Sequence, residues 1–110
     1  MSALWESAEA ANATHGRASA PFAATGVSID SRSLQKGDLF VALKGPNHDG
    51  HDHVCAAFAA GAVAAMVAHK PANAPADAPL LSVKDTQHGL EALGRAARHR
   101  ARARVAAVTG

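Results

Sequence analysis

The stretch Leu39-Phe40-Val41-Ala42-Leu43 is apolar at every position, which is typical of a β-strand that is covered on both faces of its sheet. The turn sequence Lys36-Gly37-Asp38 leads into it. Upstream, Gly26-Val27-Ser28-Ile29-Asp30 alternates apolar and polar side chains, which is the period of a half-buried strand. Downstream, residues 62–68 and 80–83 are short apolar runs between turn signals, and they predict two further buried strands.

Helices are predicted between and after these strands, over residues 2–14, 53–60 and about 85–101. The candidate N-cap residues are Ser2 for the first helix, Asp52 for the second, and Asp85 or Thr86 for the third. His15-Gly16 is expected to end the first helix, because glycine tolerates the left-handed turn found at helix ends.

The third helix and the segment after it complete the predicted fold. Leu90, Leu93 and Ala97 recur at helical spacing, so they are expected to form the inner face of this helix. Residues 104–109 predict a last strand. Strands that alternate with helices favour an α/β fold with parallel pairing, here a small sheet of short strands with helices packed on it.

The composition fits one compact domain with a thin core. Of the 110 residues, 48% are hydrophobic and 18% are charged, whereas 29 are alanine and only 4% are aromatic. No apolar run reaches the roughly 18 residues that a membrane helix needs, and the start lacks the pattern of a signal peptide. Cys55 is the single cysteine and cannot form an internal disulfide. We therefore expect a soluble, cytoplasmic protein without a membrane partner.

The excess of positive charge is small and local. The net charge is +2, and arginines crowd residues 95–104. Arg95, Arg98 and Arg102 share one helix face, which keeps a nucleic-acid-binding fragment open as an alternative. The segment has neither interleaved aromatic residues nor a recognised binding motif, so a solvated face or an interdomain contact is the favoured interpretation, and no nucleic-acid partner is expected.

A polar loop over residues 46–53 follows the buried strand and begins with Pro46, Asn47 and His48. Open α/β sheets bind their ligands at the carboxyl ends of strands, so this loop predicts a ligand site. Its backbone amides and carbonyls can bind a phosphate or a polar heterocycle. A stand-alone metal-binding module that uses His48 and His51 is the alternative, but the histidine spacing fits no established metal motif, and no metal site is expected.

A second polar strand end lies at Ser28-Ile29-Asp30-Ser31-Arg32. It combines hydroxyl groups, a carboxylate and a guanidinium, and arginine suits two-pronged recognition of a phosphate or carboxylate. The structural alternative is a turn in which Asp30 pairs with Arg32 and a serine caps the turn.

Four segments in order resemble the N-terminal domain of the Mur ligases: residues 26–32 (GVSIDSR), 37–45 (GDLFVALKG), 49–52 (DGHD) and 60–62 (AGA). Weaker matches at residues 85–86 and 105–110 extend the resemblance. Each piece alone is common, but their shared order is specific. Residues 42–45 and His51-Asp52 favour the branch that joins D-alanyl-D-alanine to UDP-N-acetylmuramoyl-tripeptide. The alternative is the preceding ligase, which adds the third amino acid and more often carries arginine in place of His51.

The resemblance implies a three-domain, ATP-dependent ligase of peptidoglycan synthesis. ATP, with Mg²⁺, phosphorylates the terminal carboxylate of the peptide, and the amine of the dipeptide attacks the acyl phosphate. Residues 1–84 would form the domain that binds the UDP-sugar-peptide, and residues 85–110 would begin the ATP-binding domain. Residues 105–110 resemble the strand that enters the family's phosphate-binding loop, with Gly110 as the first glycine of that loop.

The resemblance also assigns roles to individual residues. Those that would contact the nucleotide portion are Ile29, Ser31, Pro46, Asn47 and His48, and those that would brace the pocket are Asp30 and Arg32. The later phosphate-binding residues and the groups that align the reactants are absent from these 110 residues. We therefore expect no catalytic residue in this chain, no bound cofactor and no activity of the isolated chain. We also expect a monomer.

Overall fold

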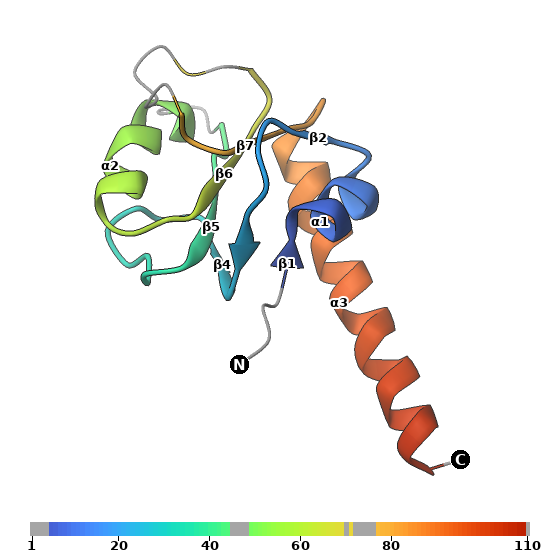
Figure 1. Cartoon of the computed structure of the whole chain (residues 1–110). Coiled ribbons are helices and arrows are strands. Elements are labelled where there is room, and N and C mark those ends of the chain that lie inside the picture. Colours follow the sequence, from blue (N-terminus) through green and yellow to red (C-terminus); the bar gives the residue numbers. More distant parts are fainter. Residues whose placement is uncertain (1–4, 45–48, 70, 72–76, 110) are drawn as a thin grey trace.

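The computed structural model describes residues 5–44, 49–69, 71 and 77–109 (Figure 1). Its main sheet contains β2 (Arg17–Ala18), β4 (Gly26–Ser28), β5 (Asp38–Val41), β6 (Ala64–Val67) and β7 (Leu80–Ser82). Their order in space is β2-β7-β6-β5-β4. The four strands from β4 to β7 pair in parallel, whereas β2 is antiparallel to β7. A separate antiparallel pair joins β1 (Trp5–Glu6) to β3 (Ala23–Ala24).

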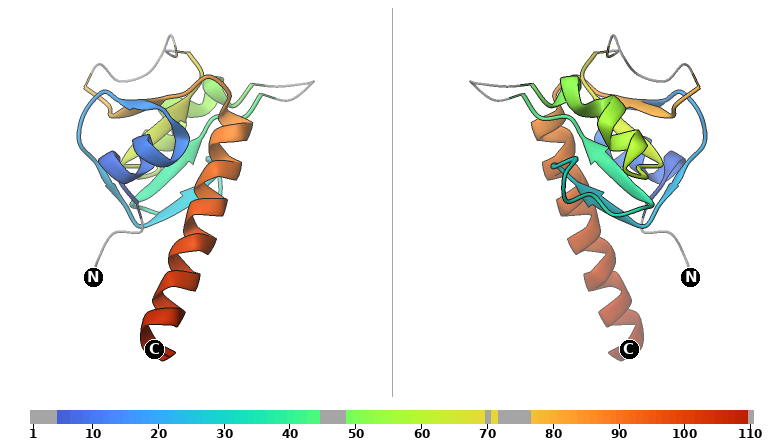
Figure 2. Two further views of the ribbon diagram at one scale, coloured as in Figure 1. Left: turned by 90° about the vertical axis from the view of Figure 1, so that its right-hand side faces the viewer. Right: turned by 90° about the vertical axis from the view of Figure 1, so that its left-hand side faces the viewer.

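Helices cover both faces of this sheet (Figure 2). Helix α1 (Ser7–Thr14) and helix α3 (Thr86–Thr109) pack on one face, and α2 (Val54–Ala59) packs on the other. A short 3₁₀ helix, η1 (Gly50–His53), leads directly into α2. The predicted α/β fold, a small sheet of short strands with helices packed on it, is therefore confirmed.

The central strands owe their position to side chains that alternate between two cores. In β5, Leu39 and Val41 belong to the core beneath α1 and α3, whereas Phe40 packs in the core beneath α2. Met66 of β6 joins the first core, and Val67 joins the second. Burying a side chain such as Leu39 or Phe40 contributes about 1.5–3 kcal/mol, which explains why an apolar run with no polar face forms the middle of the sheet.

Helix α3 packs against the sheet through the face predicted for it. Leu93 is buried in the core, and Leu90 and Ala97 pack against that core. Of the two candidate caps, Asp85 makes the capping bonds: its Oδ1 accepts from the backbone N–H of Gln87 at 2.8 Å and of His88 at 3.3 Å.

The start of the chain differs from the predicted helix over residues 2–14. Ser2 lies outside the described residues, and Trp5 is in β1, where it pairs with Ala24 and is only 3% exposed. Burial of the indole in the core outweighs the helical preference of its neighbours. The left-handed residue at the end of α1 is His15, with φ 57°, rather than Gly16. Gly16 serves a close approach instead, because a Cβ there would lie 2.6 Å from the carbonyl oxygen of Ser82.

The predicted last strand over residues 104–109 is also wrong, because α3 continues to Thr109. Alanine and arginine are strong helix formers, and a helix satisfies its own backbone hydrogen bonds without a neighbouring strand. Gly110 lies outside the described residues. The division into residues 1–84 and 85–110 stays a prediction. Within the described ranges, no helix is both long and apolar enough to cross a bilayer.

Candidate functional site

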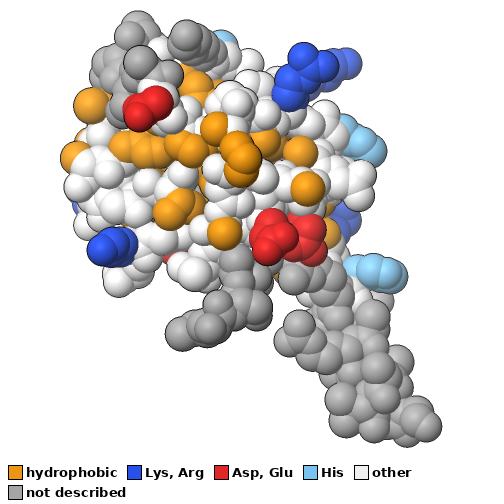
Figure 3. Space-filling view, in the orientation of Figure 1, with side chains coloured by type: hydrophobic (Ala, Val, Ile, Leu, Met, Phe, Trp, Pro, Cys, Tyr) orange, Lys and Arg blue, Asp and Glu red, His pale blue; other side chains and the backbone are white. Residues whose placement is uncertain are grey.

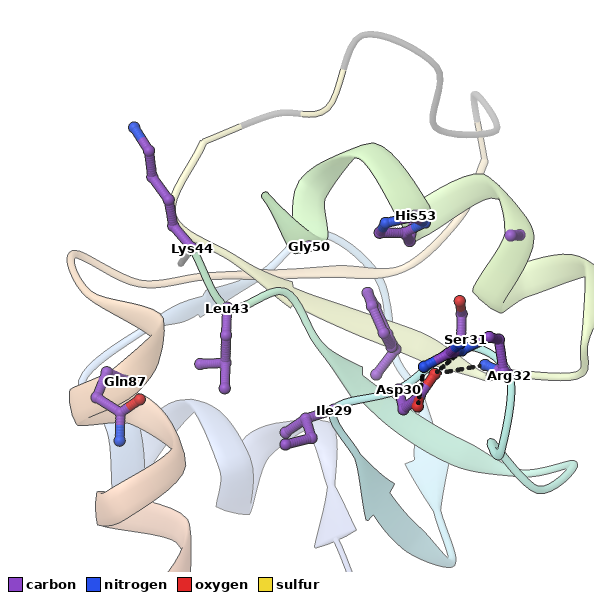
Figure 4. Close-up of a pocket in the computed structure, with 11 residues that line it drawn as sticks. Ile29, Asp30, Ser31, Arg32, Leu43, Lys44, Gly50, His53 and Gln87 are labelled. Carbon is purple, nitrogen blue, oxygen red and sulfur yellow. Dashed lines mark hydrogen bonds and ion pairs between the residues drawn. The ribbon is translucent and has the colours of Figure 1, made fainter. Parts of the chain in front are cut away.

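The two polar strand ends lie beside each other because β4 and β5 are adjacent and parallel. Val27 is in register with Leu39 and Ser28 with Phe40, so both strands end at the same edge of the sheet. A cavity of about 890 Å³ opens at this edge. Its lining residues are Ile29, Asp30, Ser31, Arg32, Phe40, Leu43, Lys44, Gly50, His53, Ala56 and Gln87 (Figure 4). The predicted residues 29–32 thus share one pocket with the chain that follows β5.

The turn after β4 is held by hydrogen bonds within itself. Ser28 Oγ donates to the carbonyl oxygen of Asp30 at 3.0 Å and accepts from its backbone N–H at 3.2 Å. The Asp30 carboxylate accepts from the backbone N–H of Arg32 at 2.8 Å and from Arg32 Nε and Nη2 at 3.2 Å each. The side-chain bond from Arg32, followed by the backbone bond, lowers the pKa of Asp30. The pairing of Asp30 with Arg32, which the sequence offered as the structural alternative, therefore forms. It lies at the pocket itself.

This ion pair is exposed, so it shapes the turn more than it stabilises the fold. The side chain of Arg32 is 89% exposed and that of Asp30 is 42% exposed. Exposed pairs contribute little to stability because water screens them. The pairing does hold a guanidinium at the rim of the cavity, where its exposed surface is accessible to an anionic ligand.

One wall of the cavity is apolar. Ile29 is 56% exposed, and it is the one large hydrophobic side chain that is exposed in the described part of the chain. Ile29 and Leu43 point into the same space from the ends of β4 and β5, with Gln87 of α3 beside them (Figure 4). An apolar wall next to polar turns is the usual character of a small-molecule site.

The loop after β5 returns tightly to the strand it leaves. Lys44 forms an isolated bridge with Asp49, and the backbone N–H of Gly50 donates to the carbonyl oxygen of Leu43 at 2.7 Å. A Cβ at Gly50 would lie 2.8 Å from Leu43 N and 2.9 Å from Leu43 O, so this approach requires glycine. The predicted contacts Pro46, Asn47 and His48 lie outside the described residues.

Asp49, rather than the predicted Asp52, caps the helical segment after this loop. Its Oδ1 accepts from the backbone N–H of His51 at 3.0 Å. The segment starts earlier than predicted, as η1, and the cap moves with it. The pKa of Asp49 is lowered, first by this backbone bond and then by the side-chain bond to His51.

Asp49, His51 and His69 each offer a metal-ligand atom, and these atoms lie within 4.8 Å of one another. Both ring nitrogens of His51 already have partners: Nδ1 is 2.6 Å from Asp49 Oδ1, and Nε2 accepts from the backbone N–H of Ala68 at 3.0 Å. A metal on His51 would have to displace one of these bonds. The geometry therefore favours a hydrogen-bonded cluster over a metal site.

Sequence reasoning missed several lining residues. Gln87 comes from α3, 55 positions after Arg32, and nothing in its local sequence marks it. The sequence places Leu43 at a strand end, Lys44 within the family match and His53 in the polar loop, but it assigns none of them to the pocket. Their place directly after a buried parallel strand was the available signal.

The alternative of a nucleic-acid surface depends on Arg95, Arg98 and Arg102, and the side chain of Arg102 lies outside the described residues. On the face shown in Figure 3, the lysine and arginine side chains that are coloured lie in separate places rather than in one continuous patch. Nucleic-acid binding normally requires a basic stripe or patch.

Comparison with known proteins gives a consistent result. Residues 23–101 match the Mur ligase family, catalytic domain. A UDP-N-acetylmuramoyl-tripeptide–D-alanyl-D-alanine ligase of Bacillus subtilis is 38% identical over 85 residues, which are 77% of this chain and 19% of that protein. A UDP-N-acetylmuramoyl-L-alanyl-D-glutamate–2,6-diaminopimelate ligase of Bacteroides thetaiotaomicron is 40% identical over 63 residues, 57% of this chain and 13% of that protein.

Solved structures agree with these relatives. A crystal structure of MurF from Acinetobacter baumannii matches 90% of this chain and 22% of its own, with a TM-score of 0.70 and 32% identity. MurF from Thermotoga maritima in complex with ADP matches 63% of this chain and 16% of its own, with a TM-score of 0.55 and 33% identity. The chain spans about a fifth of the length of the first relatives it matches. Because the family match extends over more than half of its residues, the chain belongs to the Mur ligase family.

Proposed function

We propose that this chain is the part of an ATP-dependent amide ligase that recognises the uridine-diphosphate end of UDP-N-acetylmuramoyl-tripeptide. The observation that carries the proposal is the shared cavity. Two polar turns that are separated in sequence meet at one edge of a parallel sheet, beside an exposed isoleucine. Family membership supplies the substrate class, and the pocket supplies a place of suitable size and chemistry.

The lining residues divide into an apolar and a polar part. Ile29 and Leu43 offer a surface for the flat face of a base, and the Ser31 hydroxyl offers a donor and an acceptor. Arg32 and Lys44 offer positive charge to the diphosphate. In this proposal Asp30 acts through Arg32, whose guanidinium it holds in place. Pro46, Asn47 and His48 stay predicted contacts in the same loop.

The proposed reaction of the whole enzyme joins D-alanyl-D-alanine to the tripeptide. The Bacillus relative and the MurF structures favour this branch, and the ADP bound to the Thermotoga MurF supports use of ATP. Mg²⁺ as the partner of ATP stays a prediction. The diaminopimelate-adding relative favours the second candidate, addition of the third amino acid. Amide formation by the whole protein with each amino substrate in turn would separate the two.

The proposal gives this chain a binding role only. Gly110 is the proposed first glycine of the phosphate-binding loop, and transition-state stabilisation in phosphoryl transfer needs the further charges of that loop. We therefore expect no ATP hydrolysis by the 110-residue chain alone. A cytoplasmic monomer remains the expected form, and the exposed free thiol of Cys55 is compatible with a reducing compartment.

Calorimetric titration of the chain with uridine diphosphate tests the binding role, with cytidine diphosphate as the comparison ligand. Loss of one hydrogen bond in Ser31→Ala is expected to weaken uridine diphosphate binding by about 1 kcal/mol, or roughly fivefold. Ser33→Ala is the matched control, because Ser33 is exposed in the same turn but does not line the cavity. Equal affinity in both variants would remove Ser31 from the site, and no binding by the unchanged chain would refute the proposed function.

A further inference from the structure

The buried imidazole of His51 makes two bonds that only one neutral tautomer can satisfy together. His51 is 4% exposed. Its Nε2 accepts from the backbone N–H of Ala68, so this nitrogen carries a lone pair. Its Nδ1, 2.6 Å from Asp49 Oδ1, then carries the proton and donates to the carboxylate. Each partner therefore bonds a different ring nitrogen. Moving the proton from Nδ1 to Nε2 would break both bonds.

The two partners belong to different parts of the fold. Asp49 closes the loop after β5, through its bridge to Lys44 and its bond to the His51 backbone. Ala68 directly follows β6, and its N–H is 17 positions away from His51 in sequence. The imidazole therefore connects the base of the loop to the end of the neighbouring strand. Lys44, Gly50 and His53, which line the cavity, lie in this same loop and in η1.

The surroundings of the ring keep it in place. His69 stacks on it, with ring centroids 4.0 Å apart and planes at 14°. Among the described residues, the titratable groups seen in contact with His51 are this imidazole and the Asp49 carboxylate, and His69 Nε2 lies 3.9 Å from Asp49 Oδ2. A proton on His51 Nε2 would remove the lone pair that accepts from the N–H of Ala68. The bond between His51 and Ala68 therefore requires the neutral ring.

We infer that His51 is a positioning residue: in its Nδ1-protonated neutral form it ties the loop after β5 to the end of β6 and so fixes that side of the ligand pocket. Neither a metal nor direct contact with the ligand is involved. The effect on ligand binding rests on the proposed function, whereas the tautomer and the bond to Ala68 do not.

Three variants separate the contributions. His51→Leu removes both hydrogen bonds at similar volume, whereas His51→Gln keeps an amide oxygen that can accept from Ala68. His99→Gln is the matched control, since His99 is exposed on α3 and does not line the cavity. Uridine diphosphate affinity is expected to fall about tenfold in His51→Leu, less in His51→Gln, and not at all in His99→Gln.

Nitrogen-15 NMR of the unchanged chain tests the tautomer directly, and amide hydrogen exchange tests the bond to Ala68. We expect a protonated-type Nδ1, a lone-pair-type Nε2, and an Ala68 amide that is protected in the unchanged chain and in His51→Gln but not in His51→Leu. The opposite tautomer, or unchanged Ala68 exchange in His51→Leu, would overturn the inference. So would equal ligand affinity in His51→Leu and the unchanged chain. If the unchanged chain binds no uridine diphosphate, the proposed function fails, while the NMR and exchange results still decide the role of His51.

Discussion

Gly50→Ala is the substitution that best tests how the pocket is built. The added Cβ would lie 2.8 Å from Leu43 N, 2.9 Å from Leu43 O and 3.1 Å from the carbonyl carbon of Ala42. Ordinary contact begins at 3.4 Å, so the loop must move away from Leu43 by about 0.6 Å (3.4 minus 2.8). All three atoms belong to the backbone of Ala42 and Leu43, which directly follow the buried strand β5, so we expect the loop rather than this backbone to yield.

The cost follows from two contributions. Overpacking of this kind costs about 1–3 kcal/mol, and weakening of the 2.7 Å bond from Gly50 N–H to Leu43 O adds about 1 kcal/mol. We expect a loss of about 2–4 kcal/mol in the free energy of unfolding. A small domain with a stability of about 5–15 kcal/mol remains folded after such a loss, so ligand binding can still be measured.

Urea denaturation measures the loss in the free energy of unfolding, and titration with uridine diphosphate measures the affinity of the pocket for its ligand. Gly94→Ala is the matched control, because a Cβ built at this position of α3 meets no atom within 4 Å apart from its chain neighbours and the backbone of its own helix turn. This control is expected to gain up to about 1 kcal/mol from better helix propensity and to bind the ligand unchanged. If Gly50→Ala proves as stable as Gly94→Ala and binds the ligand equally well, the close return of the loop onto β5 is not what shapes the pocket.

Three further results are expected. Ile29→Ser should weaken uridine diphosphate binding about threefold to tenfold without lowering the free energy of unfolding, since this side chain is exposed. Calorimetry measures the affinity and urea denaturation measures the stability, and an unchanged affinity would remove the apolar wall from the site. Phe40→Ala should destabilise the fold by about 3–5 kcal/mol in urea denaturation, and a loss below about 1 kcal/mol would contradict its place in the core. The Asp30 carboxyl should titrate below its ordinary value of 3.8 in NMR, with its pairing complete above that value and lost as the pH falls through the lowered pKa; Arg32→Gln should raise this pKa, and no change would refute the pairing.

The sequence predicted the four parallel strands of the sheet because their signals are local, whereas the antiparallel edge strand β2 was not among the predicted strands. An uninterrupted apolar run such as residues 39–43 can be buried only between two layers, and the alternation of residues 26–30 fits the neighbouring strand. The meeting of the two strand ends followed from parallel pairing.

Other features depend on contacts between distant residues, and local patterns could not supply them. The local sequence predicts Trp5 as part of a helix, because its strand partner Ala24 is 19 positions away and contributes nothing to the local pattern. Gln87 reaches the pocket because α3 packs beside β6, and the role of His51 depends on an amide 17 residues away. Residues 105–110 resemble a strand of the family, whereas helix propensity decides the structure of this segment up to Thr109.

Mapping amide chemical shifts during titration of the nitrogen-15-labelled chain with uridine diphosphate tests the central claim most directly. We expect residues 29–32 to shift together with Leu43, Lys44 and Gly50, with a common dissociation constant. A second cavity of about 730 Å³, lined by parts of α1 and by residues such as Lys84, His88 and Arg95, offers the competing location. Shifts confined to that cavity, or to only one of the two strand ends, would contradict a site formed by both.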